Sequence, residues 1–357
     1  MCANRPQVCD EAAARRWQRV QKQAHAAYQP CEFTSFVGFE WSATPAYSHN
    51  HRNVIFANEN VTDKAIDAIR YPALGEFWSQ LDARCRPEQG CDAIAIPHNS
   101  NMGDGFSFDI ETDGQRALEL RARFERLIEI HQEKGNSECL APFGAEDDND
   151  CAFERYLTRR SRAQAAGDFN REDWEQMRKT YARSLLLRGL EAYAGAGDHH
   201  RNPLQLGLIG STDNHTATPG HVEEDQWPGS AFGLGDFERA LSRIDWNPGG
   251  LVAEPDLVPL ARIDVIKGEW RDGEARETVF DITPAEGVHS KICLIWGDPD
   301  FDIDAPAFWY VRVEQEATPR WSSVLCKAEN RCEEYPAAAR AIRERAWSSP
   351  IWYLPIR

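Results

Sequence analysis

The residues best suited to chemistry are an aspartate and a histidine two positions apart, Asp213 and His215, in the segment GSTDNH. They follow the apolar run LGLI, which predicts a short strand. Side chains two residues apart on a strand point to the same face, so a carboxylate and an imidazole can bind one metal ion. The plainer alternative is an aspartate that caps a turn beside a solvated histidine.

Two other places in the chain have the same design. The β-prone run FVGFE ends in Glu40, and the run AIAIPH ends in His98. In a barrel of parallel strands, catalytic residues meet at the carboxyl ends of the strands. An ordinary salt bridge at Glu40 and a hydrogen-bonded loop histidine at His98 are the alternatives. We therefore expect a metal cluster with four protein ligands: Glu40, His98, Asp213 and His215.

Motifs along most of the chain carry a resemblance to a known family. They are FVGFEWS at 36–42, HRNVIF at 51–56, AIPHNSN at 95–101, EIHQEKGNSE at 129–138, GSTDNHTATPG at 210–220, WNPGG at 246–250, IDVIKG at 263–268, DPDFD at 298–302 and ERAWSSPIWY at 344–353. With these motifs the chain resembles the bacterial domain of unknown function 3604 family, a branch of the PHP (polymerase and histidinol phosphatase) metallohydrolases.

The resemblance implies a fold, a reaction and roles for residues. The fold would be α/β, a partial, distorted PHP-like (β/α) barrel. The reaction would be hydrolysis of a phosphate ester or related ester by water activated by two or three divalent ions, Mn, Zn or Fe. Glu40 would bridge metals. His51 would be a ligand or an acid, and Arg52 would clamp developing negative charge. His49 imitates an H-x-H motif with His51, but the family match begins at His51, so we interpret His49 as incidental.

The family's opening H-x-H and D-H motifs are expected upstream of residue 1, and a second gap follows residues 246–250. The chain is therefore interpreted either as a fragment or as a reduced paralogue. A rival hypothesis of another class follows from the missing ligands. In it the chain is catalytically silent and acts as a binding or structural module.

Composition limits the partners. The 357 residues carry a formal charge of −17, which disfavours nucleic acid and anionic membranes because both require a basic surface. A small phosphorylated substrate remains compatible, since bound cations can reverse the local field. No apolar run approaches the length of a membrane span. We expect a small-molecule ester as substrate.

The cysteines point to an oxidising compartment. The chain has ten, and none forms a C-x-x-C pair of the zinc-ribbon or thioredoxin type. Loop-closing disulfides are favoured, as in periplasmic or secreted proteins, although some cysteines could instead be small buried apolar residues. The close pairs are Cys2 with Cys9, Cys85 with Cys91, Cys139 with Cys151 and Cys326 with Cys332, which leaves Cys31 and Cys293.

Helical and strand patterns alternate up to about residue 246, which predicts an α/β domain over residues 1–246 with mainly parallel strands. Residues 247–357 form short β-rich runs separated by turns, which predicts a smaller β-rich region. Within it, the segment 337–346 has the composition of a helix.

Overall fold

The computed structural model describes residues 6–45, 48–108, 110, 113–145, 149–156, 170–195, 201–213, 258–285, 289, 291–336 and 340–355. Helices alternate with strands that form several small sheets, so the chain is α/β. The strands of the described residues close no barrel. The chain divides into two compact units, one of Met1–His98 with Asp109–Leu127 and the other of Asn99–Phe108 with Ile128–Arg357. The predicted domain boundary after residue 246 lies outside the described residues.

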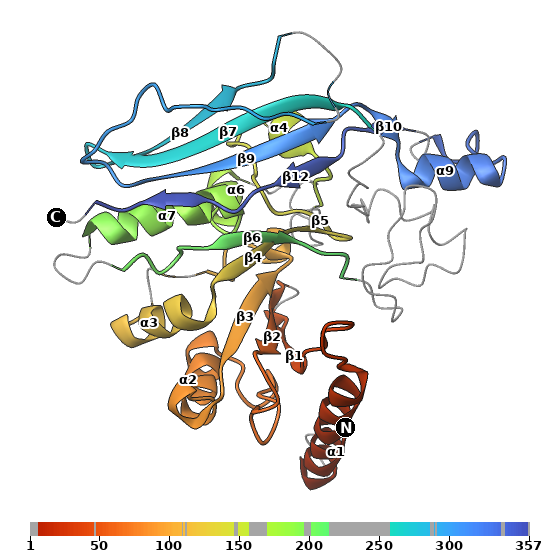
Figure 1. The fold of residues 1–357 in the computed structure, drawn as a ribbon, viewed down its shortest axis with the longest axis vertical. Coiled ribbons are helices and arrows are strands. Elements are labelled where there is room, and N and C mark those ends of the chain that lie inside the picture. Colours follow the sequence, from red (N-terminus) through yellow and green to blue (C-terminus); the bar gives the residue numbers. More distant parts are fainter. Residues whose placement is uncertain are drawn as a thin grey trace. The chain divides into compact units, whose positions relative to one another are not determined.

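Figure 1 labels the helices and strands of the first unit. They are α1 (Pro6–Ala27), β1 (Gly38–Ala43), β2 (Asn50–Phe56), α2 (Leu74–Arg84), β3 (Ala93–His98) and α3 (Gln115–Phe124), with a 3-10 turn (Pro87–Gln89) before β3.

The second unit begins with a 3-10 turn (Ser100–Met102) and continues from β4 to the C-terminal strands (Figure 1). Its elements are β4 (Leu127–Gln132), β5 (Gly135–Asn136), α4 (Asn149–Ala152), α6 (Arg171–Arg178), α7 (Ala182–Gly195), β6 (Gly207–Gly210), β7 (Leu260–Arg271), β8 (Glu274–Asp281), β9 (Ala307–Gln315), β10 (Thr318–Pro319), α9 (Trp321–Ala328), β11 (Ala341–Ile342), β12 (Arg345–Trp347) and β13 (Ile351–Tyr353).

A three-stranded sheet in the order β1-β2-β3 forms the centre of the first unit. One face of this sheet and the apolar sides of α2 and α3 share one hydrophobic core, where each large buried side chain contributes roughly 2 kcal/mol. The core residues alternate along the strands, as the two-residue period of a strand requires. They are Trp41 and Ala43 on β1, Val54 and Phe56 on β2, and Ala93 and Ala95 on β3.

Strand pairing corrects the sequence-based prediction. Both pairs in this sheet, β1 with β2 and β2 with β3, are antiparallel, so the expected parallel arrangement is wrong here. The reason for the first pair is the short connection, since residues 44–49 are too few for the crossover that parallel strands need. Glu40 is also not at a strand end, because β1 continues to Ala43.

The β-rich C-terminal region expected from the sequence is present as a sheet in the order β12-β9-β7-β8, with β13 also paired to β9. Helix α7 contacts β7 and β8. The helix predicted over residues 337–346 is wrong, because β11 and β12 occupy its described second half. Helix propensity is overridden there by backbone pairing of β12 with β9.

Three of the predicted cysteine pairs are at disulfide distance: Cys85–Cys91, Cys139–Cys151 and Cys326–Cys332. Cys31 and Cys293, which the spacing left unpaired, are free and exposed. Cys2 lies outside the described residues. The loops closed by these bonds are short, which is why spacing along the sequence was enough to pair them.

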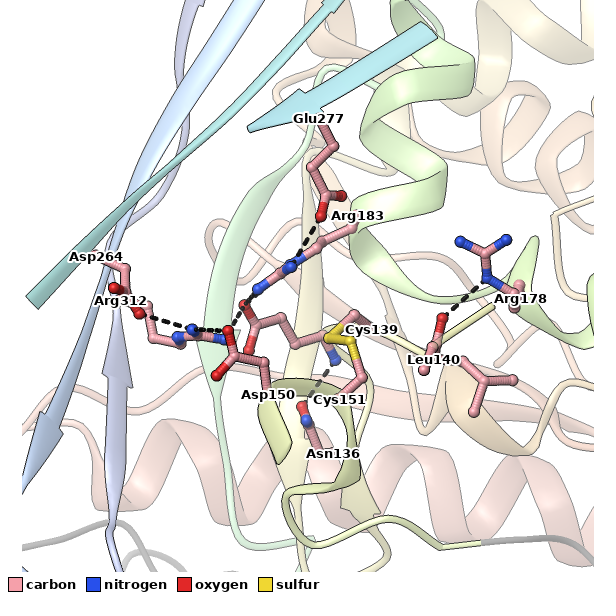
Figure 2. Close-up of a disulfide and its surroundings, with 12 residues drawn as sticks. Asn136, Cys139, Leu140, Asp150, Cys151, Arg178, Arg183, Asp264, Glu277 and Arg312 are labelled. Carbon is pink, nitrogen blue, oxygen red and sulfur yellow. Dashed lines mark hydrogen bonds and ion pairs between the residues drawn. A yellow bond between two sulfur atoms is a disulfide. The ribbon is translucent and has the colours of Figure 1, made fainter. Parts of the chain in front are cut away.

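The disulfide Cys139–Cys151 of the second unit lies near Asp150, Arg183 and Arg312 (Figure 2). Glu138 Oε1 accepts a hydrogen bond from Arg183 at 2.7 Å, and Asp150 Oδ2 accepts one from Arg312 at 2.9 Å. Burial alone would raise the pKa of Glu138, but the neighbouring arginines outweigh it and lower that pKa to about 2. Each acid directly precedes one of the bonded cysteines, so the disulfide limits how far the two acids can separate.

Removing this disulfide is therefore expected to destabilise the chain. The Cys139→Ala/Cys151→Ala double variant should lose about 3 kcal/mol of unfolding free energy, the value for a loop of this size. Urea unfolding of the oxidised protein measures the loss. The matched control is Cys326→Ala/Cys332→Ala, whose shorter loop should give a smaller loss of about 2 kcal/mol. Equal stability of the first variant and the unmodified chain would contradict the expectation.

Candidate metal centre

Three metal-competent side chains gather on the face of the β1-β2-β3 sheet opposite the hydrophobic core. His51 on β2 lies directly opposite His98 on β3 in the strand register. On the other side of β2, His51 lies opposite Ser42 of β1, and Glu40 is two residues before Ser42. A diagonal neighbour of this kind is within reach of a long side chain. The antiparallel register therefore brings Glu40, His51 and His98 together.

The distances within this triad are short. Glu40 Oε1 lies 2.9 Å from His51 Nδ1 and 3.3 Å from His98 Nε2. One ligand atom from each residue falls within 4.8 Å of the others. The three side chains differ in their access to solvent. His98 is 2% exposed, His51 is 13% exposed and Glu40 is 37% exposed. The triad thus has a buried end and an end open to solvent.

The electrostatics of Glu40 favour its ionised form. Partial burial by itself would raise the pKa of this carboxyl, but hydrogen bonds from His51 and His98 outweigh burial and hold the pKa well below its usual range. Glu40 is therefore a carboxylate at any physiological pH. A carboxylate next to two imidazoles is a donor set that suits Zn, Mn or Fe. The residues fit a divalent ion in type, number and spacing.

Arg52, predicted as a charge clamp, lies on the opposite face from the triad. It pairs in register with Trp41 and is 1% exposed. Its Nε donates to Glu125 Oε1 at 2.7 Å, and Arg121 donates to the other oxygen of Glu125 at 2.8 Å. Strand alternation requires this outcome, because neighbours on a strand point to opposite faces and His51 faces the triad. The structure does not bring Arg52 together with the other candidate residues.

This placement predicts a structural effect for Arg52. Changing Arg52→Met keeps most of the side-chain volume but leaves Glu125 with one arginine, so we expect a loss of about 3 kcal/mol in unfolding free energy. Urea unfolding measures it. The control is Arg15→Met, which removes an exposed pair with Glu11 and should cost less than about 1 kcal/mol. Unchanged stability together with lost hydrolysis would instead support the predicted clamp role.

The remaining predicted ligands, Asp213 and His215, are only partly described. His215 lies outside the described residues. Asp213 belongs to the second unit, has a left-handed backbone conformation with φ of 51°, and forms an ion pair with the buried Lys134. Lys134 Nζ also lies 3.5 Å from Glu133 Oε1. Whether Asp213 and His215 join the triad stays a prediction.

Glu129 and His131 belong to the motif EIHQEKGNSE at 129–138, and both are buried in the second unit. The ring of His131 lies 5.6 Å from that of Phe153 and 5.9 Å from that of Trp347. Burial first, and the positive charge of Arg345 next, lower the pKa of His131 to about 4. His131 is thus a neutral imidazole in an aromatic environment.

The pKa of His131 makes stability depend on pH. An unfolded histidine with a pKa near 6.5 binds a proton between pH 6.5 and 4, whereas folded His131 does not. Unfolding free energy should therefore fall as pH falls through this window, by up to about 1.4 kcal/mol per pH unit from this residue. Urea unfolding at several pH values should show a shallower slope for His131→Phe. The exposed His25→Phe control should keep the original slope, and an unchanged slope in His131→Phe would contradict the prediction.

Sequence reasoning missed one polar neighbour of the triad. The hydroxyl oxygen of Thr44 lies 2.9 Å from His51 Nε2. Thr44 continues the alternation of Glu40 and Ser42, so the spacing of these three residues was a signal available in the sequence. His49, interpreted as incidental, has its ring centroid 4.7 Å from that of His51.

Comparison with known proteins establishes the family. The family described as "Protein of unknown function (DUF3604)" matches residues 1–245 and 288–355. The chain belongs to the DUF3604 family. The match of this DUF3604 protein contains all three residues of the triad and omits residues 246–287, where the WNPGG and IDVIKG segments lie. No curated protein and no solved structure matches the chain.

None of the described helices combines the length and the apolar character that crossing a bilayer requires.

Proposed function

We propose that this DUF3604 protein is a metal-dependent hydrolase of the PHP type, acting on a phosphate ester or a related ester. The observation that carries the proposal is the triad of Glu40, His51 and His98, whose ligand atoms lie within 4.8 Å of one another. Two imidazoles and one ionised carboxylate on a rigid sheet form a donor set for a divalent ion. The resemblance to PHP metallohydrolases agrees with this assignment.

Glu40, His51 and His98 would hold a Mn, Zn or Fe ion. Such an ion, when bound, lowers the pKa of water and polarises an ester oxygen. Because Glu40 is an ionised carboxylate, it would help to hold one ion or two. His98, the most buried member, fixes the inner end of the site, while the more exposed Glu40 leaves the outer end accessible.

Access and charge support a small-molecule substrate. The Glu40 side chain is 37% exposed, and the net charge of −17 disfavours polyanionic partners such as nucleic acid. A phosphate group would have to be neutralised locally, which is what divalent ions at the triad would do.

We also propose that the protein works in an oxidising compartment, as a periplasmic or secreted enzyme. Three cysteine pairs at disulfide distance support this, because such bonds rarely persist in the cytosol.

A second candidate function has a specific observation in its favour. Asp213, which the sequence predicted as a metal ligand, forms an ion pair with Lys134. The ammonium group of Lys134 thus supplies the positive charge beside this carboxylate. If the triad binds metal without hydrolysis, this DUF3604 protein is a catalytically silent binding or structural module.

The first test measures metal and hydrolysis together. We expect the unmodified chain to bind Zn or Mn by calorimetry and to hydrolyse p-nitrophenyl phosphate or bis(p-nitrophenyl) phosphate in the presence of that metal. Because Glu40→Gln and His98→Ala each remove a ligand, metal affinity should fall by more than the roughly 100-fold seen when an outer partner of a ligand is lost. The hydrolytic rate should fall in parallel.

Matched controls come from an exposed histidine and glutamate of the same unit, which lie 3.5 Å apart. His25→Ala and Glu59→Gln should leave metal affinity and rate unchanged. Metal binding without hydrolysis of either ester would favour the binding module. Equal metal binding by the unmodified chain and Glu40→Gln would refute the metal centre itself.

A further inference from the structure

Strand β1 and the residue that follows it present hydrogen-bonding groups to both ring nitrogens of His51. Glu40, Ser42 and Thr44 are spaced by two residues, and in the register Ser42 lies directly opposite His51. Glu40 and Thr44 therefore flank that position on either side along β1, with Thr44 one residue beyond the end of the strand. The imidazole of His51 lies between them.

The contacts agree with this arrangement. Nδ1 of His51 lies 2.9 Å from Glu40 Oε1, and Nε2 lies 2.9 Å from Thr44 Oγ1. The His49 ring, 4.7 Å from the His51 ring between centroids, further restricts rotation of the imidazole. The nitrogen that faces Glu40 and the nitrogen that faces Thr44 thus have separate roles.

The chemistry of a histidine ligand gives Thr44 its role. A histidine that binds metal through one nitrogen carries its proton on the other, and the partner of that N–H determines the tautomer and the ring orientation. A threonine hydroxyl can accept this hydrogen bond, and it can also donate to an unprotonated nitrogen. It therefore suits His51 both with and without metal.

We propose that Thr44 is a positioning residue for the metal centre. Without metal, Nδ1–H of His51 donates to Glu40, and the Thr44 hydroxyl donates to Nε2. With metal bound, Nε2 would carry the proton and donate to Thr44, which would keep Nδ1 facing Glu40. This inference rests on the proposed metal centre, and it adds a residue that neither the motifs nor the ligand types indicate. In this proposal Thr44 acts on the site through His51.

The expected effect is moderate. Outer partners of metal ligands typically contribute 10- to 100-fold in affinity. Thr44 is exposed, so water can partly replace its hydroxyl, and we expect a loss near the lower end of that range, about tenfold.

The test uses the full chain with Zn or Mn as the probe. Thr44→Val removes the hydroxyl at nearly constant shape and should weaken metal binding about tenfold by calorimetry. Thr44→Ser restores a hydroxyl and should bind close to the unmodified chain. The visible spectrum of the Co-substituted protein, which reports ligand geometry, should change in Thr44→Val and be restored in Thr44→Ser. Thermal unfolding without metal should be the same for all three proteins, which separates positioning from general stability.

Each result decides a different question. Equal affinity and equal Co spectra for Thr44→Val and the unmodified chain would overturn the role of Thr44 while leaving the metal centre in place. An equal loss in Thr44→Ser would also overturn it, since the hydroxyl would then not be the relevant group. Failure of the unmodified chain to bind any of the three metals would refute the metal centre and the role of Thr44 with it.

Discussion

The register of the antiparallel β1-β2-β3 sheet is the constraint on which the candidate site depends. A shift of one residue in a strand moves its side chains to the other face of the sheet. In β2 such a shift would put the core residue Arg52 in the place of His51. The large side chains Trp41 and Phe56 prevent such a shift, because each is fully buried against the helices of the first unit. The chemistry on one face is thus held in place by packing on the other.

Buried ion pairs add specificity to this packing. Arg52 and Arg121 share the two oxygens of Glu125 inside the first unit, and Arg121 also lies 4.5 Å over the ring of Trp78. In the second unit, Glu138 forms ion pairs with several arginines, and it directly precedes a disulfide-bonded cysteine. Charges removed from water are costly unless they are paired, so each pair penalises structures that separate its members. Arg52, which the sequence suggested for chemistry, contributes in this way.

The triad combines a fixed inner end with an accessible outer end. His98 is buried on a strand whose neighbour carries His51, whereas Glu40 remains partly exposed. Preorganised ligands spare a metal site the cost of ordering its side chains on binding. The same arrangement explains the proposed importance of Thr44, since the imidazole of His51 has greater access to water than that of His98 and has more rotational freedom to lose.

The sequence by itself determined what depends on residue type and short spacing. The family, the α/β class and the short-range pairing of cysteines are readable without coordinates, as are the metal-competent residue types at positions 40 and 98. Alternation also requires His51 and Arg52 to face opposite ways, but not which of them faces the core. Only the tertiary structure decided that, through antiparallel pairing, the packing of Trp41 on Phe77 of α2 and the ion pair of Arg52 with Glu125. The physical reason is that strand direction and register depend on contacts between segments far apart in the chain, which local patterns do not encode.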